Sequence, residues 1–453
     1  MTENYLTNIT PDGITGMIFG MEGIRQTVVL LNGPTGCRFY HSTTSQFLSI
    51  HPLLYLPSRS GEKVPVDFNY LNNWFFRQQR VPCTWLDGED YVYGTEEKVR
   101  AGILFIKEHI QFDLIAVINS PGASLIGDRI QDLLGELLPD GRYVMLESPG
   151  FSTEFSAGYE QACLSLLQQL GKTGALKKRE DQRQTAEGAK PRVNVLGLSI
   201  WNRYFEGDRK EIERILKLCG IEVNCFLAAD CSMDEILRIP EADLNLVLDP
   251  QMGTQAAQYL EKEYGMPFYV CDCPPVGFSA SEKLCRDLSE RLGTDPAEAL
   301  KECETSRALA WYKINGIYRA SGLPKGAVFA VQGSASQVLA YTTFCIEYLG
   351  MTPDVLSVTG NPEPSVRKRL EEMLDKHHAH AALDKPIEET QAELVFGDAN
   401  FIASLMTTDK VFCGIEISLP GMGYTDLIPK THFGIHGALF LTEQVLNGLM
   451  SRL

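Results

Sequence analysis

A single cysteine, Cys37, follows a tight turn in the stretch LNGPTGCRFY at residues 31–40. The apolar residues VVLL just before the turn predict a buried strand, and the glycines and proline after them predict a turn. A helix that begins beyond this turn would place its free N–H groups and positive end near the sulfur, which favours the thiolate. Cys37 is therefore a candidate nucleophile or metal ligand. The alternative is a buried cysteine that acts as a small apolar residue.

A second pair of cysteines, Cys271 and Cys273, lies in the stretch YVCDCPPVGF at residues 269–278. We predict that both lie on one strand, where side chains two residues apart point to the same face. A metal or redox role is one interpretation of this pair. Ordinary packing is the other, because the pair lacks further ligands at metal-binding spacing.

Strands and helices that would position these residues alternate along almost the whole chain. The alternation predicts an α/β fold with parallel sheets flanked by helices. In such sheets ligands bind beyond the carboxyl ends of the strands, so we expect functional residues just after each strand. The predicted strands are VVLL, DLIAVIN and RYVMLE in the first third, VNVLGL, IEVNCF, LNLVLD and PFYVCD in the middle third, and AVFAVQG, DVLSVTG, ELVFGD and KVFCGI in the last. The predicted helices include 94–110, 124–137, 154–169, one that opens at residues 207–208, and 254–264.

Three similar α/β units in series predict three Rossmann-like domains. The first spans residues 1–175 and carries the Cys37 loop, and a charged linker without periodicity follows at 176–191. The second domain spans 192–310, and the third spans 311–453 with the C-terminal segment. The length of 453 residues agrees with this division, at roughly 150 residues per domain.

Composition excludes several classes of function. The formal net charge of −17 would repel a phosphate backbone, so nucleic acid is not an expected partner. No apolar run approaches the roughly 18 residues of a membrane span, so no membrane association is expected. The N-terminal residues MTENYLTNIT lack the features of a secretory signal, which predicts a cytoplasmic location. The 12 cysteines are then expected as thiols or metal ligands rather than as disulfides.

The order of the sequence motifs resembles component 1 of the nitrogenase family over nearly the whole chain. The resemblance implies three Rossmann-like domains per subunit and an iron-sulfur cluster, [4Fe-4S], at a subunit interface. It further implies a homodimer, or a heterodimer or tetramer with a paralogous subunit, and a separate ATP-hydrolysing iron protein that supplies low-potential electrons. The motifs are GMEGIRQTVVLLNGPTGCRFY, GEDYVYGTEEKV, INSPGASLIGDRI, ESPGFS, EKEYGMPFY, VFAVQGSASQVLAYTTFCIEYLG and THFGIHGALFLTEQVLNGL.

The cluster ligands that the resemblance implies are only partly present. Cys37 stands at the position of one cysteine ligand, where the B-type subunit of the light-independent reductase carries an aspartate. The other two ligand positions hold Pro11 or Asp12 and Ser120. Cys83 lies in a neighbouring loop and could substitute as a ligand, and Asp12 or Ser120 could offer oxygen ligands, although such clusters are held mainly by thiolates.

The resemblance also places candidate substrate residues. The cysteine that holds the metal cofactor of nitrogenase corresponds to about Asp249, and the histidine ligand falls close to His432 but about one residue out of register. A nitrogenase-type molybdenum cofactor and reduction of N2 are therefore not expected. The same cavity in the tetrapyrrole reductases accepts an organic substrate, so Asp249, His432 and His436 are candidate proton donors or substrate contacts. The alternative is that they are polar residues satisfied at strand ends and in a loop.

The sequence thus predicts a nitrogenase-like reductase subunit that acts on a small molecule or a tetrapyrrole. Two alternatives remain. One is a scaffold or carrier that binds an iron-sulfur cluster or a metallocofactor during assembly without turnover. The other is a cluster-free protein that keeps the fold for small-molecule sensing.

Overall fold

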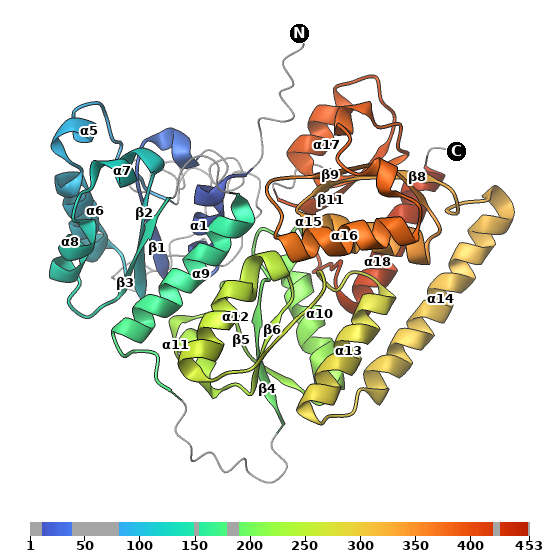
Figure 1. The fold of residues 1–453 in the computed structure, drawn as a ribbon, viewed down its shortest axis with the longest axis horizontal. Coiled ribbons are helices and arrows are strands. Elements are labelled where there is room, and N and C mark those ends of the chain that lie inside the picture. Colours follow the sequence, from blue (N-terminus) through green and yellow to red (C-terminus); the bar gives the residue numbers. More distant parts are fainter. Residues whose placement is uncertain (1–10, 39–80, 149–153, 179–189, 420–425, 452–453) are drawn as a thin grey trace.

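The computed structural model describes residues 11–38, 81–148, 154–178, 190–419 and 426–451. It contains three parallel sheets flanked by helices, which confirms the predicted α/β fold (Figure 1). Within these residues no helix is both long and apolar enough to cross a membrane.

The first sheet has the strand order β1-β2-β3, and its strands are parallel. Its elements are α1 (Gly13–Glu22), β1 (Thr27–Asn32), the 3-10 helix η2 (Thr35–Arg38), α5 (Asp90–Tyr93), α6 (Glu96–His109), β2 (Leu114–Asn119), α7 (Pro121–Ile126), α8 (Ile130–Leu137), β3 (Tyr143–Glu147) and α9 (Phe155–Lys172). The helix predicted over 124–137 is two helices, because Gly127 adopts a left-handed conformation with φ 80° and ends α7.

The second sheet has the order β5-β4-β6-β7. Its elements are β4 (Arg192–Leu196), α10 (Phe205–Leu218), β5 (Glu222–Phe226), α11 (Met233–Leu237), η4 (Ile239–Glu241), β6 (Leu244–Val247), α12 (Pro250–Tyr264), β7 (Phe268–Val270) and α13 (Phe278–Leu292). The prediction that Cys271 and Cys273 lie on a strand is wrong, because β7 ends at Val270 and the pair follows it. Proline at 274 and 275 cannot donate to a sheet, which limits the strand at this end.

The third sheet has the order β11-β10-β8-β9. Its elements are α14 (Ala297–Ser321), β8 (Val328–Gly333), α15 (Ala335–Thr343), the π-helical turn η5 (Phe344–Tyr348), β9 (Thr352–Val358), α16 (Pro364–Lys376), η6 (His380–Ala382), η7 (Ile387–Glu389), β10 (Leu394–Asp398), α17 (Ala399–Met406), β11 (Cys413–Ser418) and α18 (Gly434–Met450). Helix α14 runs without a break across residues 310 and 311, where the sequence places a domain boundary.

The hydrophobic cores join the three sheets. One core extends from the second sheet into the third and includes Val195, Leu246, Phe329 and Phe396. Another extends from the first sheet into the second along α1, α9 and α12. Because buried apolar surface continues from sheet to sheet, the carboxyl ends of the three sheets are held in fixed positions relative to one another.

Helices α1 and α9 approach closely enough that glycine is required between them. A Cβ atom on Gly158 would lie 2.0 Å from the carbonyl oxygen of Gly13, and one on Gly16 would lie 2.0 Å from that of Phe155. Both obstacles are backbone atoms, which cannot rotate away. This contact fixes the start of α9, and that start lines the site described below.

Gly158→Ala is expected to lower the free energy of unfolding by about 1–3 kcal/mol, the usual cost of overpacking. Urea denaturation monitored by circular dichroism measures the change. Gly88→Ala is the matched control, because no atom lies within 4 Å of its Cβ position, and it should stay within about 0.5 kcal/mol of the parent chain. Equal stabilities of the two variants would contradict the helix contact.

Candidate functional site

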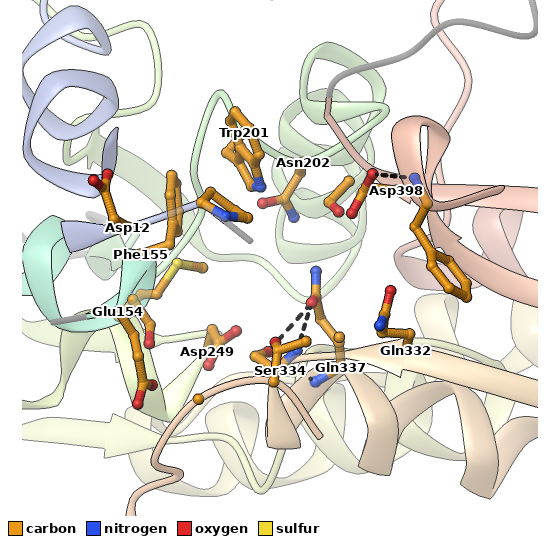
Figure 2. Close-up of a pocket in the computed structure, with 18 of the residues that line it drawn as sticks. Asp12, Glu154, Phe155, Trp201, Asn202, Asp249, Gln332, Ser334, Gln337 and Asp398 are labelled. Atoms are coloured by element: carbon orange, nitrogen blue, oxygen red, sulfur yellow. Dashed lines mark hydrogen bonds between the residues drawn. The ribbon is translucent and has the colours of Figure 1, made fainter. Parts of the chain in front are cut away.

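A cavity of about 470 Å³ lies where the carboxyl ends of the three sheets converge (Figure 2). This is the place where parallel sheets bind ligands. The described lining holds carboxyl, amide, hydroxyl and aromatic groups, and it includes no lysine, arginine or histidine. The polar residues that line it are Asp12, Glu154, Ser156, Asn202, Asp249, Gln332, Ser334, Gln337, Thr359, Asn361, Asp398, Asn400, Ser404 and Ser418, and the aromatic ones are Phe155, Trp201 and Phe401.

Asp249 lies two residues after the end of β6 and is the N-cap of α12. One carboxylate oxygen accepts a hydrogen bond from the backbone N–H of Gln251 at 2.9 Å, and the other accepts one from the hydroxyl of Ser336 at 2.8 Å. Burial raises the pKa of Asp249 to about 6, and these two hydrogen bonds limit the rise. The group therefore exchanges a proton near neutral pH at the wall of the cavity.

Asp398 ends β10 and has a closely similar position in the third sheet. It is the N-cap of α17, and its carboxylate accepts a hydrogen bond from the backbone N–H of Phe401 at 2.9 Å. Burial again raises the pKa, to about 6. The cavity thus has two carboxyl groups, from different sheets, that titrate in the same pH range.

Glu154 closes the cavity between the first and third sheets. Its carboxylate accepts a hydrogen bond from the backbone N–H of Asn361, in the loop after β9. The neighbouring Gly360 has φ 80°, and a Cβ atom there would lie 2.2 Å from the Glu154 carboxyl carbon. Burial raises the pKa of Glu154. The left-handed backbone conformation of residue 360 favours glycine there.

His432 lies behind the cavity rather than in its wall. It is 2% exposed and shares a small space of about 20 Å³ with Asp249 and Tyr341. One ring nitrogen, Nδ1, is 2.8 Å from the Tyr341 hydroxyl, and Nε2 is 2.6 Å from Oε1 of Gln444. Burial lowers the pKa of His432 to about 4, so the ring is neutral near pH 7. Nε2–H then donates to Gln444, and Nδ1 accepts from Tyr341.

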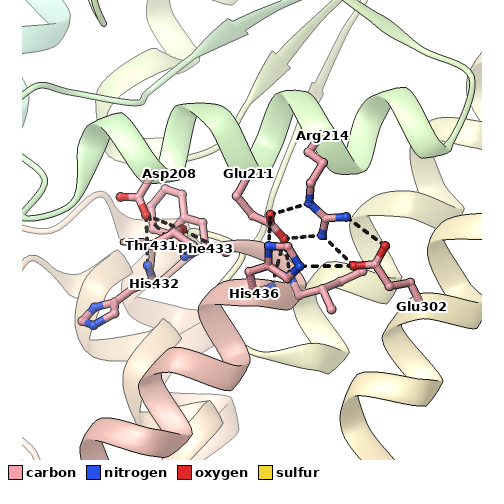
Figure 3. Close-up of polar contacts among 9 residues, drawn as sticks. Asp208, Glu211, Arg214, Glu302, Thr431, His432, Phe433 and His436 are labelled. Atoms are coloured by element: carbon pink, nitrogen blue, oxygen red, sulfur yellow. Dashed lines mark hydrogen bonds and ion pairs between the residues drawn. The ribbon is translucent and has the colours of Figure 1, made fainter. Parts of the chain in front are cut away.

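His436 lies outside the cavity, in a polar network between α10, α14 and α18 (Figure 3). Its Nδ1 is 3.2 Å from Glu211 and its Nε2 is 3.6 Å from Glu302. The hydrogen bond to Glu211 raises the pKa of His436. Of the three candidate catalytic residues, the structure places Asp249 in the cavity, His432 behind it and His436 beyond it.

The candidate cluster residues converge at the carboxyl edge of the first sheet. Cys37 lies in η2 after β1, and Cys83 pairs with Leu31 of β1 through an isolated bridge. Ser120 follows β2 and packs against Gly33, where a Cβ atom would lie 2.7 Å from that of the serine. Asp12 caps α1, since its carboxylate accepts hydrogen bonds from the backbone N–H and the hydroxyl of Thr15, and it also lines the cavity.

Polar side chains hold this edge of the sheet together. The side-chain amide of Asn32 donates to Asn119 and to Thr95, both at 2.9 Å, and the Thr84 hydroxyl donates to Asn32. The amide of Asn119 donates in turn to Glu147. These bonds cross from β1 to β3 and tie the segment after Cys83 to the turn before Cys37.

The prediction that the helix start favours a Cys37 thiolate is wrong for the chain by itself. Burial raises the pKa of the half-buried Cys37 thiol, and the charges of Asp12 and Cys83 raise this pKa further by smaller amounts. The reason is that η2 is a 3-10 helix of four residues, which has little dipole to oppose burial. Cys37 packs against the core cluster that includes Cys83, and the helix α1 that Asp12 caps contacts η2. Among the described residues, no group of three or more histidine, cysteine, aspartate or glutamate side chains could hold a metal ion.

Residues 14–450 match the family model described as nitrogenase component 1 type oxidoreductase. The chain belongs to this family. The match confirms the resemblance that the sequence motifs indicate.

Curated relatives of this family member include the B-type subunit of light-independent protochlorophyllide reductase. The protein from Synechococcus sp. (strain WH7803) is 29% identical over 282 residues, which are 61% of this chain and 52% of that protein. The one from Prochlorococcus marinus (strain MIT 9211) is 26% identical over 335 residues, 71% of this chain and 61% of that protein. In the first of these matches the chain spans about half the length of its relative.

The fold of this family member also agrees with a solved structure. The chain in "Nitrogenase Cp1 at pH 6.5" superposes with a TM-score of 0.72 at 18% sequence identity, over 98% of this chain and 92% of that one. Identity at this level supports the shared fold and nothing beyond it.

Sequence reasoning missed most of the cavity lining, including Glu154, Trp201, Gln337 and Asp398. Asp398 could have been found, because it ends the predicted strand ELVFGD and functional residues follow strands. Glu154 had no such pattern, since its partner Asn361 lies 207 residues away in the chain.

Proposed function

We propose that the chain is a nitrogenase-like component 1 subunit that reduces a small molecule or a tetrapyrrole, and not N2. Low-potential electrons come from a separate ATP-hydrolysing iron protein and pass through an iron-sulfur cluster at a subunit interface. The observation that carries this proposal is the position of Asp12, which lines the cavity and caps α1, the helix that contacts the turn holding Cys37. The candidate cluster position and the candidate substrate cavity are therefore neighbours.

Cys37 is the cluster ligand of this chain, with Cys83, Asp12 or Ser120 as further ligands. The half-buried Cys37 fits such a role, because a ligand shared at an interface must remain accessible from outside its own subunit. The described residues offer only part of a ligand set, which fits a cluster completed by a partner subunit. When bound, such a cluster transfers single electrons.

Asp249 and Asp398 supply protons to the bound substrate. Each lines the cavity and has a pKa of about 6, so each can hold or release a proton near neutral pH. The amide groups of Asn202, Gln332 and Gln337 orient the substrate through hydrogen bonds, and Trp201 and Phe155 cover it. His432 remains neutral and positions Tyr341 behind Asp249.

A proton supplied by these carboxylic acids makes turnover depend on pH. Burial raises both pKa values, so the acid forms predominate below pH 6 and are lost as the pH rises. Well above pH 6 one acid form is depleted, so we expect turnover to fall about tenfold for each further pH unit. Turnover measured from pH 5.5 to 8.5 at saturating iron protein checks this. A rate that rises across this range would contradict it.

A scaffold or carrier for an iron-sulfur cluster or metallocofactor is the second candidate. Asp12 and Ser120, which stand where the resemblance implies two cysteine ligands, support it. Mixing the purified protein with its iron protein and MgATP separates the two candidates. A reductase should accelerate ATP hydrolysis and oxidise the iron protein when substrate is present. A carrier should do neither, and should release bound iron and sulfide to an acceptor protein.

A further inference from the structure

Four carboxyl groups line the cavity without a counter-charge from the described part of the chain. They belong to Asp12, Glu154, Asp249 and Asp398. None of them forms an ion pair with a residue that the structure describes, and the described lining holds no basic side chain. The sequence stretches 1–10 and 149–153, just before Asp12 and Glu154, also contain no lysine, arginine or histidine. Carboxylates that gather in a partly buried cavity disfavour one another's ionised form, so a bound cation would stabilise them.

Asp12 and Glu154 lie side by side where the first sheet meets the cavity. Their backbones pair in an isolated antiparallel bridge. Figure 2 shows both side chains, together with Phe155, on the side of the cavity opposite Asp398. The other two acids, Asp249 and Asp398, are the proposed proton donors. The cavity therefore has a pair of adjacent carboxyl groups that the proposed proton transfer does not use.

Each of these two carboxylates has an oxygen that is free to meet a ligand. Glu154 is the N-cap of α9, but its side chain makes no capping hydrogen bond. Its Oε1 accepts the hydrogen bond from Asn361. Both hydrogen bonds from Thr15 end on Oδ1 of Asp12. Within the described residues, Oε2 of Glu154 and Oδ2 of Asp12 accept no hydrogen bond.

Two aromatic rings cover the same end of the cavity. The ring centroids of Phe155 and Trp201 are 5.0 Å apart, and Phe19 packs edge-on against Trp201 with its centroid at 4.8 Å. Trp201 is only 6% exposed, so this packing fixes the position of its ring. The face of an aromatic ring attracts a cation, and tryptophan does so most strongly. Carboxylates beside such rings are the groups that together recognise ammonium ions.

The cation that fits this end of the cavity is organic. Among the residues that the structure describes, no three histidine, cysteine, aspartate or glutamate side chains are arranged to hold a metal ion. The volume of about 470 Å³ suits a small organic molecule. A tetrapyrrole with ionised carboxylates would be repelled by the four acids of the lining.

We propose that Asp12 and Glu154, together with the rings of Phe155 and Trp201, bind the positive group of an organic ammonium ion. The inference rests on the proposed reductase function, because it names the class of its substrate: a small molecule that carries a protonated amine or a quaternary ammonium group. The rest of the substrate then faces the two proton donors. With Asp12 in this role, Cys83 and Ser120 are the further candidate ligands of the cluster.

Isothermal titration calorimetry of the full chain at neutral pH, without iron protein or MgATP, tests the proposal. The probes are benzyltrimethylammonium, benzyl alcohol and phenylacetate, which share one ring and differ in charge. We expect the cation to bind at least about tenfold more tightly than the alcohol, and the anion to bind most weakly.

Two conservative variants test the carboxyl pair itself. Glu154→Gln and Asp12→Asn should each weaken binding of the cation about tenfold or more and change binding of the alcohol less than about threefold. Both should remain folded by circular dichroism, because the new amide oxygens still accept the hydrogen bonds from Asn361 and Thr15. Both should also keep the iron content of the parent.

Glu136→Gln on α8 is the matched control, because it removes one negative charge from a side chain that is 64% exposed and lies outside the cavity. It should change binding of the cation less than about twofold. Equal affinities of the parent for the cation and the alcohol would overturn the proposal. So would binding of the cation that neither Glu154→Gln nor Asp12→Asn weakens, or displacement of the cation by an equal concentration of Ca²⁺.

This test is distinct from a test of the proposed reductase function, which concerns iron content and ATP hydrolysis. A chain that binds the cation but holds no iron and does not accelerate ATP hydrolysis would contradict the reductase function and support the cation site. A chain with iron and accelerated ATP hydrolysis that does not prefer the cation would overturn only the cation site.

Discussion

Replacing Asp249 with asparagine is expected to lower turnover by about 10²–10⁴-fold, the range that a positioned general acid contributes. Asparagine has nearly the same shape, and its side-chain oxygen can still accept the hydrogen bond from the Gln251 N–H. Its amide can donate to the Ser336 hydroxyl, so the cap of α12 is kept. The substitution removes the carboxylic acid, and with it the proton that Asp249 can donate near pH 6. Reduction rates under saturating iron protein and MgATP measure the effect.

Ser404→Ala provides the matched control for Asp249→Asn. Ser404 also lines the cavity, but its hydroxyl has no role as a proton donor near neutral pH. We expect less than a tenfold change in turnover for this variant, because it removes at most one neutral hydrogen bond. Turnover of the Asp249→Asn variant should also depend less on pH above 6 than turnover of the parent does. The pH dependence that remains is then due to Asp398. Full activity in Asp249→Asn would remove Asp249 from the proposed mechanism.

Replacing Glu211 with glutamine is expected to lower the free energy of unfolding by about 3–5 kcal/mol, the cost of removing one partner from a buried charge network. The Glu211 side chain is 3% exposed and forms an ion pair with Arg214 at 2.7 Å. It also accepts hydrogen bonds from the backbone N–H groups of Ile435 and His436, which begin α18 (Figure 3). The substitution weakens the attachment of α18 to α10. Urea denaturation at pH 7 measures the loss.

The stabilising effect of Glu211 has a defined pH dependence. Burial alone would raise the pKa of Glu211, but hydrogen bonds from His436 and Arg214 outweigh burial and lower it to about 2. A lowered pKa means that the stabilisation is present above about 4.5 and is lost as the pH falls toward 2. The difference between the parent and Glu211→Gln should therefore shrink below pH 4.5. Glu302→Gln is the control and should cost less, since Glu302 is 31% exposed. A Glu211 effect that grows with acidity would contradict this account.

The strands could be predicted from the sequence because buried parallel strands are apolar along their whole length. Runs such as LVF in β10 and VVLL in β1 have this pattern, and each falls within a strand of the structure. Helix α1 has no comparable pattern. All of its residues are buried, so it lacks the polar face that reveals a surface helix. This helix could be identified only from the tertiary packing around it, and a local sequence pattern carries no information on that packing.

The site could be predicted only where a local rule applied. Asp249 was found through the family resemblance, and its position after β6 places it in the cavity as expected. Trp201 and Gln337 come from separate sheets and have no pattern in common, so only the packing of the three sheets brings them together. The same holds for the pKa of Cys37, which depends on burial and on two residues distant in sequence, Asp12 and Cys83.

The central claim is that Cys37 holds an iron-sulfur cluster, and the iron and sulfide content of anaerobically purified protein tests it most directly. Protein from cells that assemble such clusters should contain both elements and show brown absorbance, and Cys37→Ala should lose most of each while remaining folded. Cys413→Ala is the control, because Cys413 lies in β11 of the third sheet and should leave the iron content unchanged. Parent protein that is colourless and free of iron, or a Cys37→Ala variant with full iron and sulfide, would contradict the claim.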